Sequence, residues 1–80
     1  MNPKYKIGMV FEYNTVLTKY TFEIISFSYS AEYFYYQVEW SDGLIDQFSE
    51  NSINTHLLMK KFKLIKTIDR NRVCKKKSNA

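Results

Sequence analysis

The only histidine of this 80-residue chain, His56, is the residue whose type could most directly serve acid–base catalysis. Glu50 and Asp46 lie close to it in the sequence, and an imidazole beside a carboxylate is a common general acid–base pairing. His56 is also followed directly by Leu57, and a histidine beside an apolar residue near a turn is more often a packing or surface side chain. We therefore expect a structural role for His56.

The other reactive side chain is the single cysteine, Cys74, which precedes three lysines. Neighbouring positive charge lowers the pKa of a thiol, but the sequence orients no base toward Cys74. One histidine and one cysteine fall short of a zinc ligand set, and one cysteine cannot form an internal disulfide. Two glycines cannot build a glycine-rich phosphate loop. We expect a protein that is not an enzyme and that holds no metal and no cofactor.

Exposed tyrosines are a second source of chemistry, here the chemistry of binding. Tyr33 and Tyr35 occupy alternate positions of one predicted strand, with Glu39 on the same face, and Tyr29 stands in the polar segment before it. Tyrosine is enriched at protein interfaces because it adds contact area at low entropic cost. These four residues form the predicted partner-binding patch, and cross-strand packing of the same tyrosines is the structural alternative.

The charges are divided unevenly along the chain. Residues 1–59 hold three lysines against seven carboxylates, a net charge of −4, and residues 60–80 hold nine cations against one carboxylate, a net charge of +8. A cluster of cations attracts nucleic acid, whereas an acidic body repels phosphates and suits a basic partner. The predicted nucleic-acid-binding residues are Lys60, Lys61, Lys63, Lys66, Arg70, Arg72, Lys75, Lys76 and Lys77. A role in solubility alone is the other interpretation of this basic segment.

Alternation of apolar and polar residues with a period of two predicts strands over most of the chain. We expect five strands, at about residues 7–13, 17–27, 33–40, 44–49 and 61–68, with a bulge or bend at Ile24-Ile25 that turns Ile25 and Phe27 to the opposite face. Residues 28–32 would form a polar loop, and Asp42-Gly43 a tight hairpin turn. Residues 49–58 begin with capping residues and would plug the core with Ile53, Leu57 and Leu58, which predicts one helical or 3-10 turn.

This order of elements resembles the SH3-like small β-barrel, and within it the Tudor type. The likeness covers about residues 7–66 and is carried by Ile7-Gly8, by the run Tyr36-Gln37-Val38-Glu39-Trp40-Ser41-Asp42-Gly43, and by Ser49-Glu50-Asn51-Ser52-Ile53 leading to Leu57. It implies an all-β fold, a five-stranded SH3-like, Tudor-type barrel with one short helical or 3-10 turn before the last strand. Residues 1–68 would be the single barrel domain and residues 69–80 a basic, flexible C-terminal tail.

Tudor domains that recognise methylated lysine or arginine hold the cation in an aromatic cage by cation–π attraction. The resemblance implies Tyr13, Tyr20 and Trp40 as the cage residues and Asp42 as its acidic wall. Leu44 stands where such domains often carry another aromatic residue, so this cage would be incomplete. Trp40 also shares a predicted strand face with apolar residues, and a place in the core is the other interpretation of this side chain.

These features favour a non-catalytic binding module. The first hypothesis is a protein-interaction domain that acts by covering its partner's surface; the alternatives are nucleic-acid binding through the basic tail and exposed tyrosines, and reading of methylated lysine or arginine. The composition, rich in Lys, Asn, Tyr and Phe, is similar to that of small proteins of AT-rich phages, which often inhibit host defence or redirect host machinery. No stretch is apolar enough to span a membrane and no signal-peptide region is visible. We therefore expect a cytoplasmic protein (bacterial cytoplasm or infected host cell), without a membrane partner, as a monomer or weak homodimer.

Overall fold

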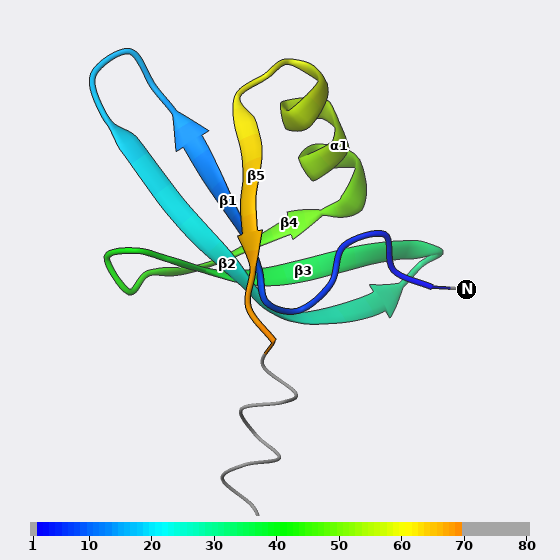
Figure 1. The fold of residues 1–80 in the computed structure, drawn as a ribbon. Coiled ribbons are helices and arrows are strands. Elements are labelled where there is room, and N and C mark those ends of the chain that lie inside the picture. Colours follow the sequence, from blue (N-terminus) through cyan, green and yellow to red (C-terminus); the bar gives the residue numbers. More distant parts are fainter. Residues whose placement is uncertain (1, 70–80) are drawn as a thin grey trace, which may run out of the picture.

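The structure, a computed structural model, describes residues 2–69. This part of the chain contains five strands and one helix (Figure 1). Their bounds are β1 Met9–Asn14, β2 Lys19–Ser30, β3 Tyr33–Trp40, β4 Ile45–Ser49, α1 Glu50–Leu58 and β5 Phe62–Thr67. Within this range, no helix has the length and apolar character needed to cross a bilayer. The basic segment from Arg70 onward lies outside the described residues.

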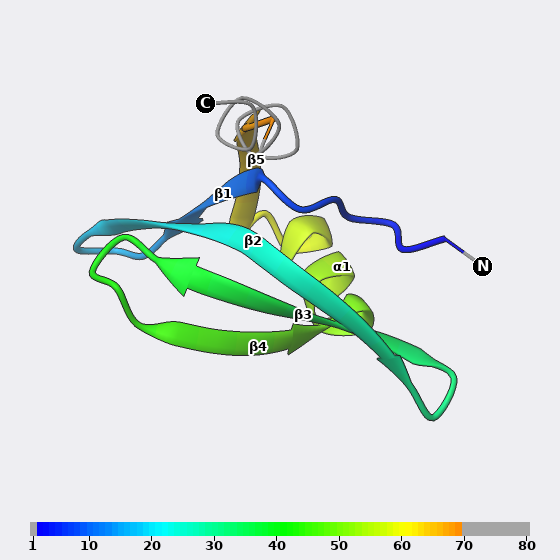
Figure 2. The ribbon, with the colours of Figure 1, turned by 90° about the horizontal axis from the view of Figure 1, so that it is seen from below.

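The strands form one antiparallel sheet in the order β4-β3-β2-β1-β5. The edge strands β4 and β5 do not pair with each other, so the expectation of a closed barrel is wrong and the sheet is open. The sheet is nevertheless strongly bent, and α1 lies in the bend, where it contacts β3, β4 and β5 (Figures 1 and 2). The helix therefore covers the gap that strand pairing leaves between the two edges.

The core lies on the inner face of this bent sheet and is mainly aromatic. The alternation predicted for β3 is confirmed, because Tyr36 and Val38 are fully buried whereas Glu39 between Val38 and Trp40 is exposed. The buried cluster consists of Tyr5, Phe11, Phe22, Ile24, Tyr36, Val38, Ile53 and Phe62. Tyr5 was not expected there, since it precedes the first strand and belongs to no periodic pattern.

A bulge interrupts β2 where the sequence predicts it. The pairing with β3 shifts between Ile24 and Ser26, so that one residue of β2 has no opposite residue. Ile24 is fully buried and Ile25 is partly exposed. The prediction for Phe27 is wrong, because it lies opposite Tyr36 and thus on the same face as Ile24.

The strand β2 is longer than predicted. Residues 28–30 were expected in a loop, yet they pair with β3 and end at Ser30, opposite Tyr33. The turn consists of Ala31 and Glu32 alone, which have φ of 51° and 69°. Two residues with positive φ match the twist of a two-residue hairpin. The β2–β3 hairpin therefore extends beyond the rest of the sheet (Figure 2).

The helix α1 spans nine residues rather than one turn. Its predicted cap is confirmed, because the Ser49 hydroxyl accepts a hydrogen bond of 3.1 Å from the Ser52 N–H. Ile53 is fully buried and plugs the core, and Leu57 packs against it partly buried. Leu58 was expected to join them, but its side chain is 85% exposed.

Gly8 is the residue that joins the start of β1 to the end of β5. Its N–H donates to the Ile24 carbonyl at 2.8 Å, and its own carbonyl accepts from the Ile68 N–H at 2.7 Å. Its φ is +98°, and a Cβ added there would lie 2.0 Å from the Ile68 carbonyl oxygen. Backbone conformation and close approach both require glycine at this position.

We predict that Gly8→Ala lowers the free energy of unfolding by about 3 kcal/mol, because it adds a backbone collision to the strain of a positive φ. Gly43→Ala is the matched control, since its φ is +93° but a Cβ there meets nothing within 4 Å. Its cost should be about 1 kcal/mol. Urea unfolding followed by Trp40 fluorescence measures both, and equal losses would contradict the close packing at Gly8.

Candidate functional site

An aromatic pocket opens where the end of β1, the start of β2 and the end of β3 lie beside one another. Tyr13 near the end of β1 lies directly opposite Tyr20 near the start of β2. Trp40 ends β3, and the following turn contributes Asp42 and Leu44. These five side chains line a hollow of about 270 Å³. The structure thus brings together the four residues that the resemblance implied as a cage, with Leu44 as a further wall.

The rings of this pocket stand at steep angles to one another. The Tyr20 and Trp40 rings are 6.5 Å apart with an interplanar angle of 89°, and the Tyr13 and Trp40 rings are 6.0 Å apart at 63°. Edge-to-face contacts of this kind are favourable between aromatic rings. The three rings therefore form an open corner rather than a flat stack.

Trp40 belongs both to the core margin and to the pocket. Its ring lies 4.9 Å from that of Phe22 and 6.2 Å from that of Phe48, two residues of the inner face. The indole N–H also points to the Asp46 carboxylate at 3.4 Å, a long and weak hydrogen bond. The side chain is therefore partly buried and held by its neighbours while it still lines the pocket.

The pocket is apolar on its walls and negative at its rim. Asp42 holds the turn through a hydrogen bond from the Leu44 N–H to its Oδ1, at 3.1 Å. Its carboxylate adds negative charge to the negative faces of the aromatic rings, and both attract a cation. Pockets that bury drug-sized molecules measure roughly 300–1,000 Å³, so this smaller hollow suits a single side chain.

The structure divides the predicted tyrosine patch between two faces. Tyr29 lies in β2 rather than in a loop, opposite Phe34, and the two ring centres are 4.8 Å apart. Tyr33 and Tyr35 lie opposite serines of β2, so they occupy the other face of this hairpin, together with Glu39. Tyr29 therefore does not share a face with the other three residues.

The predicted nucleic-acid-binding residues are only partly within the described chain. Lys60 and Lys61 lie between α1 and β5. Lys63 lies opposite Glu12 in the sheet, and Lys66 lies opposite Val10. The remaining five, Arg70, Arg72, Lys75, Lys76 and Lys77, and also Cys74, lie outside the described residues. A role of this segment in nucleic-acid binding stays a prediction.

His56 packs in the structure and does not meet a carboxylate of the pair drawn from the sequence. Its ring stacks on Phe62, with centres 4.5 Å apart and planes 16° apart, and its Nδ1 lies 2.7 Å from the Ser52 carbonyl oxygen. Glu50 lies at the opposite end of α1, where it binds Tyr36. Among residues 2–69, no three His, Cys, Asp or Glu side chains are grouped so that they could hold a metal ion.

A network of polar groups missed by the sequence reasoning ties the N-terminal segment to α1. The Tyr36 hydroxyl donates to Glu50 Oε2 at 2.7 Å and accepts from the Tyr5 N–H at 3.2 Å. The Tyr5 hydroxyl donates to Asn54, and the Lys4 N–H donates to the same Glu50 oxygen at 3.0 Å. Burial, together with the Glu50 charge, raises the pKa of Tyr36 to about 12, and the same causes raise the pKa of Tyr5. These bonds fix Tyr5 in the core and have a structural role.

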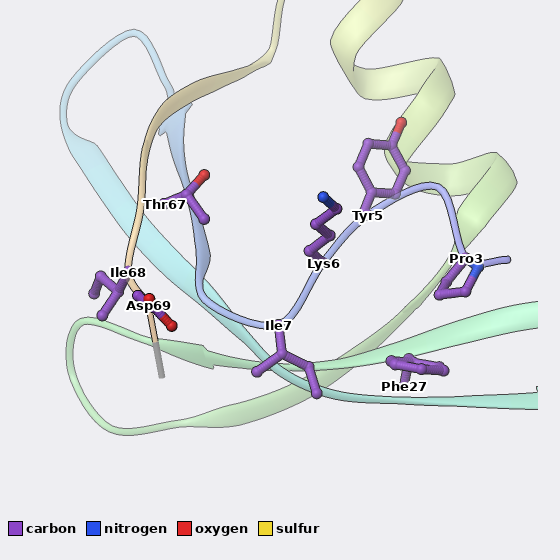
Figure 3. A pocket seen from close by; sticks show the side chains of 8 residues that line it. All are labelled: Pro3, Tyr5, Lys6, Ile7, Phe27, Thr67, Ile68 and Asp69. Carbon is purple, nitrogen blue, oxygen red and sulfur yellow. The ribbon is translucent and has the colours of Figure 1, made fainter. Parts of the chain in front are cut away.

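A second hollow, of about 380 Å³, lies between the N-terminal segment and the end of β5 (Figure 3). Thr67, Ile68 and Asp69 line one side of it, and Phe27 lies across from them, while Tyr5 points toward α1. The chain continues from Asp69 into residues that the structure does not describe.

The raised pKa of Tyr36 predicts a loss of stability in alkaline solution. Between pH 10 and about 12 an unfolded tyrosine has released its proton whereas folded Tyr36 retains it, so unfolding releases a proton and the free energy of unfolding falls as the pH rises. Tyr36→Phe should cost about 1–2 kcal/mol near pH 7, since it leaves Glu50 and the Tyr5 N–H without this partner. Above pH 10 the variant should lose stability less steeply; equal slopes in urea unfolding would contradict the assigned pKa.

The chain was compared with protein-family models, curated proteins and solved structures. No family model matches it, and neither does any curated protein or solved structure. The resemblance to Tudor domains therefore rests on the residues quoted above. The function has to be inferred from the side chains of the pocket.

Proposed function

We propose that this chain is a non-catalytic protein-interaction module whose aromatic pocket receives a cationic side chain of the partner. The observation that carries the proposal is the meeting of Tyr13, Tyr20 and Trp40 around one hollow, with Asp42 at its rim. A cation close to such ring faces is attracted to their electrons, and a nearby carboxylate adds to this attraction.

The best-suited ligand is a weakly hydrated cation. An ordinary lysine ammonium is compact and strongly hydrated, so it loses much of its hydration when it enters an apolar pocket. A methylated ammonium or an arginine guanidinium loses less and offers more apolar surface. Methylated lysine and arginine, methylated or not, are therefore the first ligands to consider. Both would be recognised by attraction of a weakly hydrated cation to aromatic rings.

The order of elements supports the likeness to Tudor domains on which this ligand was first considered. Five strands in succession, with a helical segment between β4 and β5, fit the element order that the sequence motifs imply, although the sheet is open. Leu44, 65% exposed, is the departure, because it supplies an aliphatic wall where an aromatic ring would add a further face. We propose a partial cage, and hence weak binding in the absence of further contacts with the partner.

The proposal predicts that peptides with trimethyl-lysine bind better than the same peptides with lysine or with a neutral isostere. Calorimetric titration of peptides with trimethyl-lysine, dimethyl-arginine, arginine and lysine would identify the preferred cation. Tyr20→Ala should weaken binding about fivefold, since one cation–π contact contributes about 1 kcal/mol. Asp42→Asn should weaken it and reduce its dependence on salt.

A gain of affinity and a matched control sharpen this test. Leu44→Tyr should strengthen binding of the methylated peptide about fivefold, because it completes the aromatic wall. Tyr29→Ala is the control, since Tyr29 is 47% exposed and Tyr20 is 45% exposed but only Tyr20 lines the pocket. Binding that is lost equally in Tyr29→Ala and Tyr20→Ala, or that ignores the charge of the peptide side chain, would contradict the proposal.

A further inference from the structure

Two neighbouring loops expose large apolar side chains at one end of the molecule. The β1–β2 loop carries Val16 and Leu17, which are 102% and 91% exposed. The segment from the end of α1 to β5 carries Leu58 and Met59, which are 85% and 56% exposed. A hydrogen bond of 3.1 Å from the Asn14 N–H to the Lys61 carbonyl joins the two segments. Both loops lie at the upper end of the view in Figure 1.

The β1–β2 loop is held in shape by its two threonines. The Thr15 N–H donates to the Thr18 carbonyl at 3.0 Å, and the Thr15 hydroxyl donates to the same carbonyl at 2.7 Å. The Thr18 N–H donates back to the Thr15 hydroxyl at 2.9 Å. These bonds involve neither Val16 nor Leu17, so the turn would form equally well with polar residues between the threonines. Both apolar side chains are almost fully exposed, and they line a hollow that shares Tyr20 with the aromatic pocket.

The loop segments themselves carry only positive charges, although Glu12 lies opposite Lys63 in the sheet. Residues 14–20 and 55–63 contain Lys19, Lys60, Lys61 and Lys63 and no aspartate or glutamate. The carboxylates nearest to the aromatic pocket, Asp42 and Asp46, belong to the β3–β4 hairpin instead. Protruding apolar residues within a group of lysines differ in kind from the pocket, which has an acidic rim.

We propose that this end of the molecule binds the surface of an anionic lipid bilayer, in contrast to the expectation from the sequence of no membrane partner. Val16, Leu17, Leu58 and Met59 would enter the boundary between headgroups and acyl chains, while the lysines contact lipid phosphates. The combination favours lipid over a protein partner, because a bilayer receives protruding side chains without a matching cavity. It also favours lipid over nucleic acid, because aliphatic loop tips contribute little to phosphate or base contacts. The contact is peripheral and does not depend on the proposed function of the aromatic pocket.

Sedimentation with vesicles tests this inference on the full-length chain. We expect binding to vesicles of phosphatidylcholine with one quarter phosphatidylglycerol, and at least tenfold weaker binding to phosphatidylcholine alone. The double variant Val16→Ser/Leu17→Ser should bind the anionic vesicles at least tenfold more weakly. Ile45→Ser is the matched control, since Ile45 is 58% exposed but lies on edge strand β4. Thermal unfolding should show that both variants remain folded, as their side chains are exposed.

Fluorescence distinguishes insertion from attraction by charge alone, including the charge of residues 70–80. The emission of Leu17→Trp, compared with the native Trp40 background, should shift to the blue on anionic vesicles and be quenched by lipids with brominated acyl chains, whereas that of Ile45→Trp should not. Absence of quenching, or equal vesicle binding by the parent chain and the double serine variant, would overturn the proposal. The proposal would also be overturned if the parent chain did not bind vesicles and the double serine variant lost its binding to the cationic peptide. The loops would then belong to the protein-binding surface.

Discussion

The ring of Phe22 holds the fold together, because it contacts an aromatic ring from each of the other four strands. Its neighbours are Phe11 of β1 at 5.4 Å, Trp40 of β3 at 4.9 Å, Phe48 of β4 at 5.5 Å and Phe62 of β5 at 5.0 Å. A flat five-stranded sheet could not bring both edge strands to one central side chain. The sheet therefore has to bend for this aromatic cluster to be buried.

The edges of the sheet meet through side chains instead of backbone hydrogen bonds. Phe48 of β4 and Phe62 of β5 have ring centres 5.7 Å apart although their strands are not paired. Ile53 of α1 fills the space beside them, and His56 stacks on the outer side of Phe62. These side chains enclose the core although the sheet itself is open. The same packing fixes Trp40. Part of its ring packs against Phe22, and the rest of the ring lines the pocket.

The sequence predicted those elements whose signals are local. Alternation located β3, the Asp42-Gly43 turn located the hairpin, and the doubled Ile24-Ile25 located the bulge. The wrong or incomplete predictions concern features that depend on distant contacts. Nothing local shows that β4 and β5 stay unpaired, and Ser28 and Ser30 look like loop residues because their partners in β3 lie beyond the turn.

The helix and the pocket also depend on contacts that local sequence signals do not show. The capping residues and the apolar plug predicted only one turn in residues 49–58. Asn, Ser and Thr in this segment are poor helix formers, and the buried contacts of Ile53 and the Tyr36–Glu50 hydrogen bond stabilise the nine helical residues. Tyr13, Tyr20, Trp40 and Asp42 were grouped because of the likeness to Tudor domains, and strand alternation alone would not have selected them. For Tyr29 the error was one of position, since a residue in a strand has a fixed face and a residue in a loop does not.

The claim that the aromatic pocket is the binding site is tested most directly by the indole N–H resonance of Trp40. The chain has a single tryptophan, so this signal stands alone in a two-dimensional nitrogen–proton spectrum. On titration with a trimethyl-lysine peptide, it should shift progressively together with the Asp42 and Leu44 amides. The neutral isostere of the peptide should leave these signals in place. Shifts confined to other parts of the sheet, with the indole signal unchanged at saturation, would contradict the account.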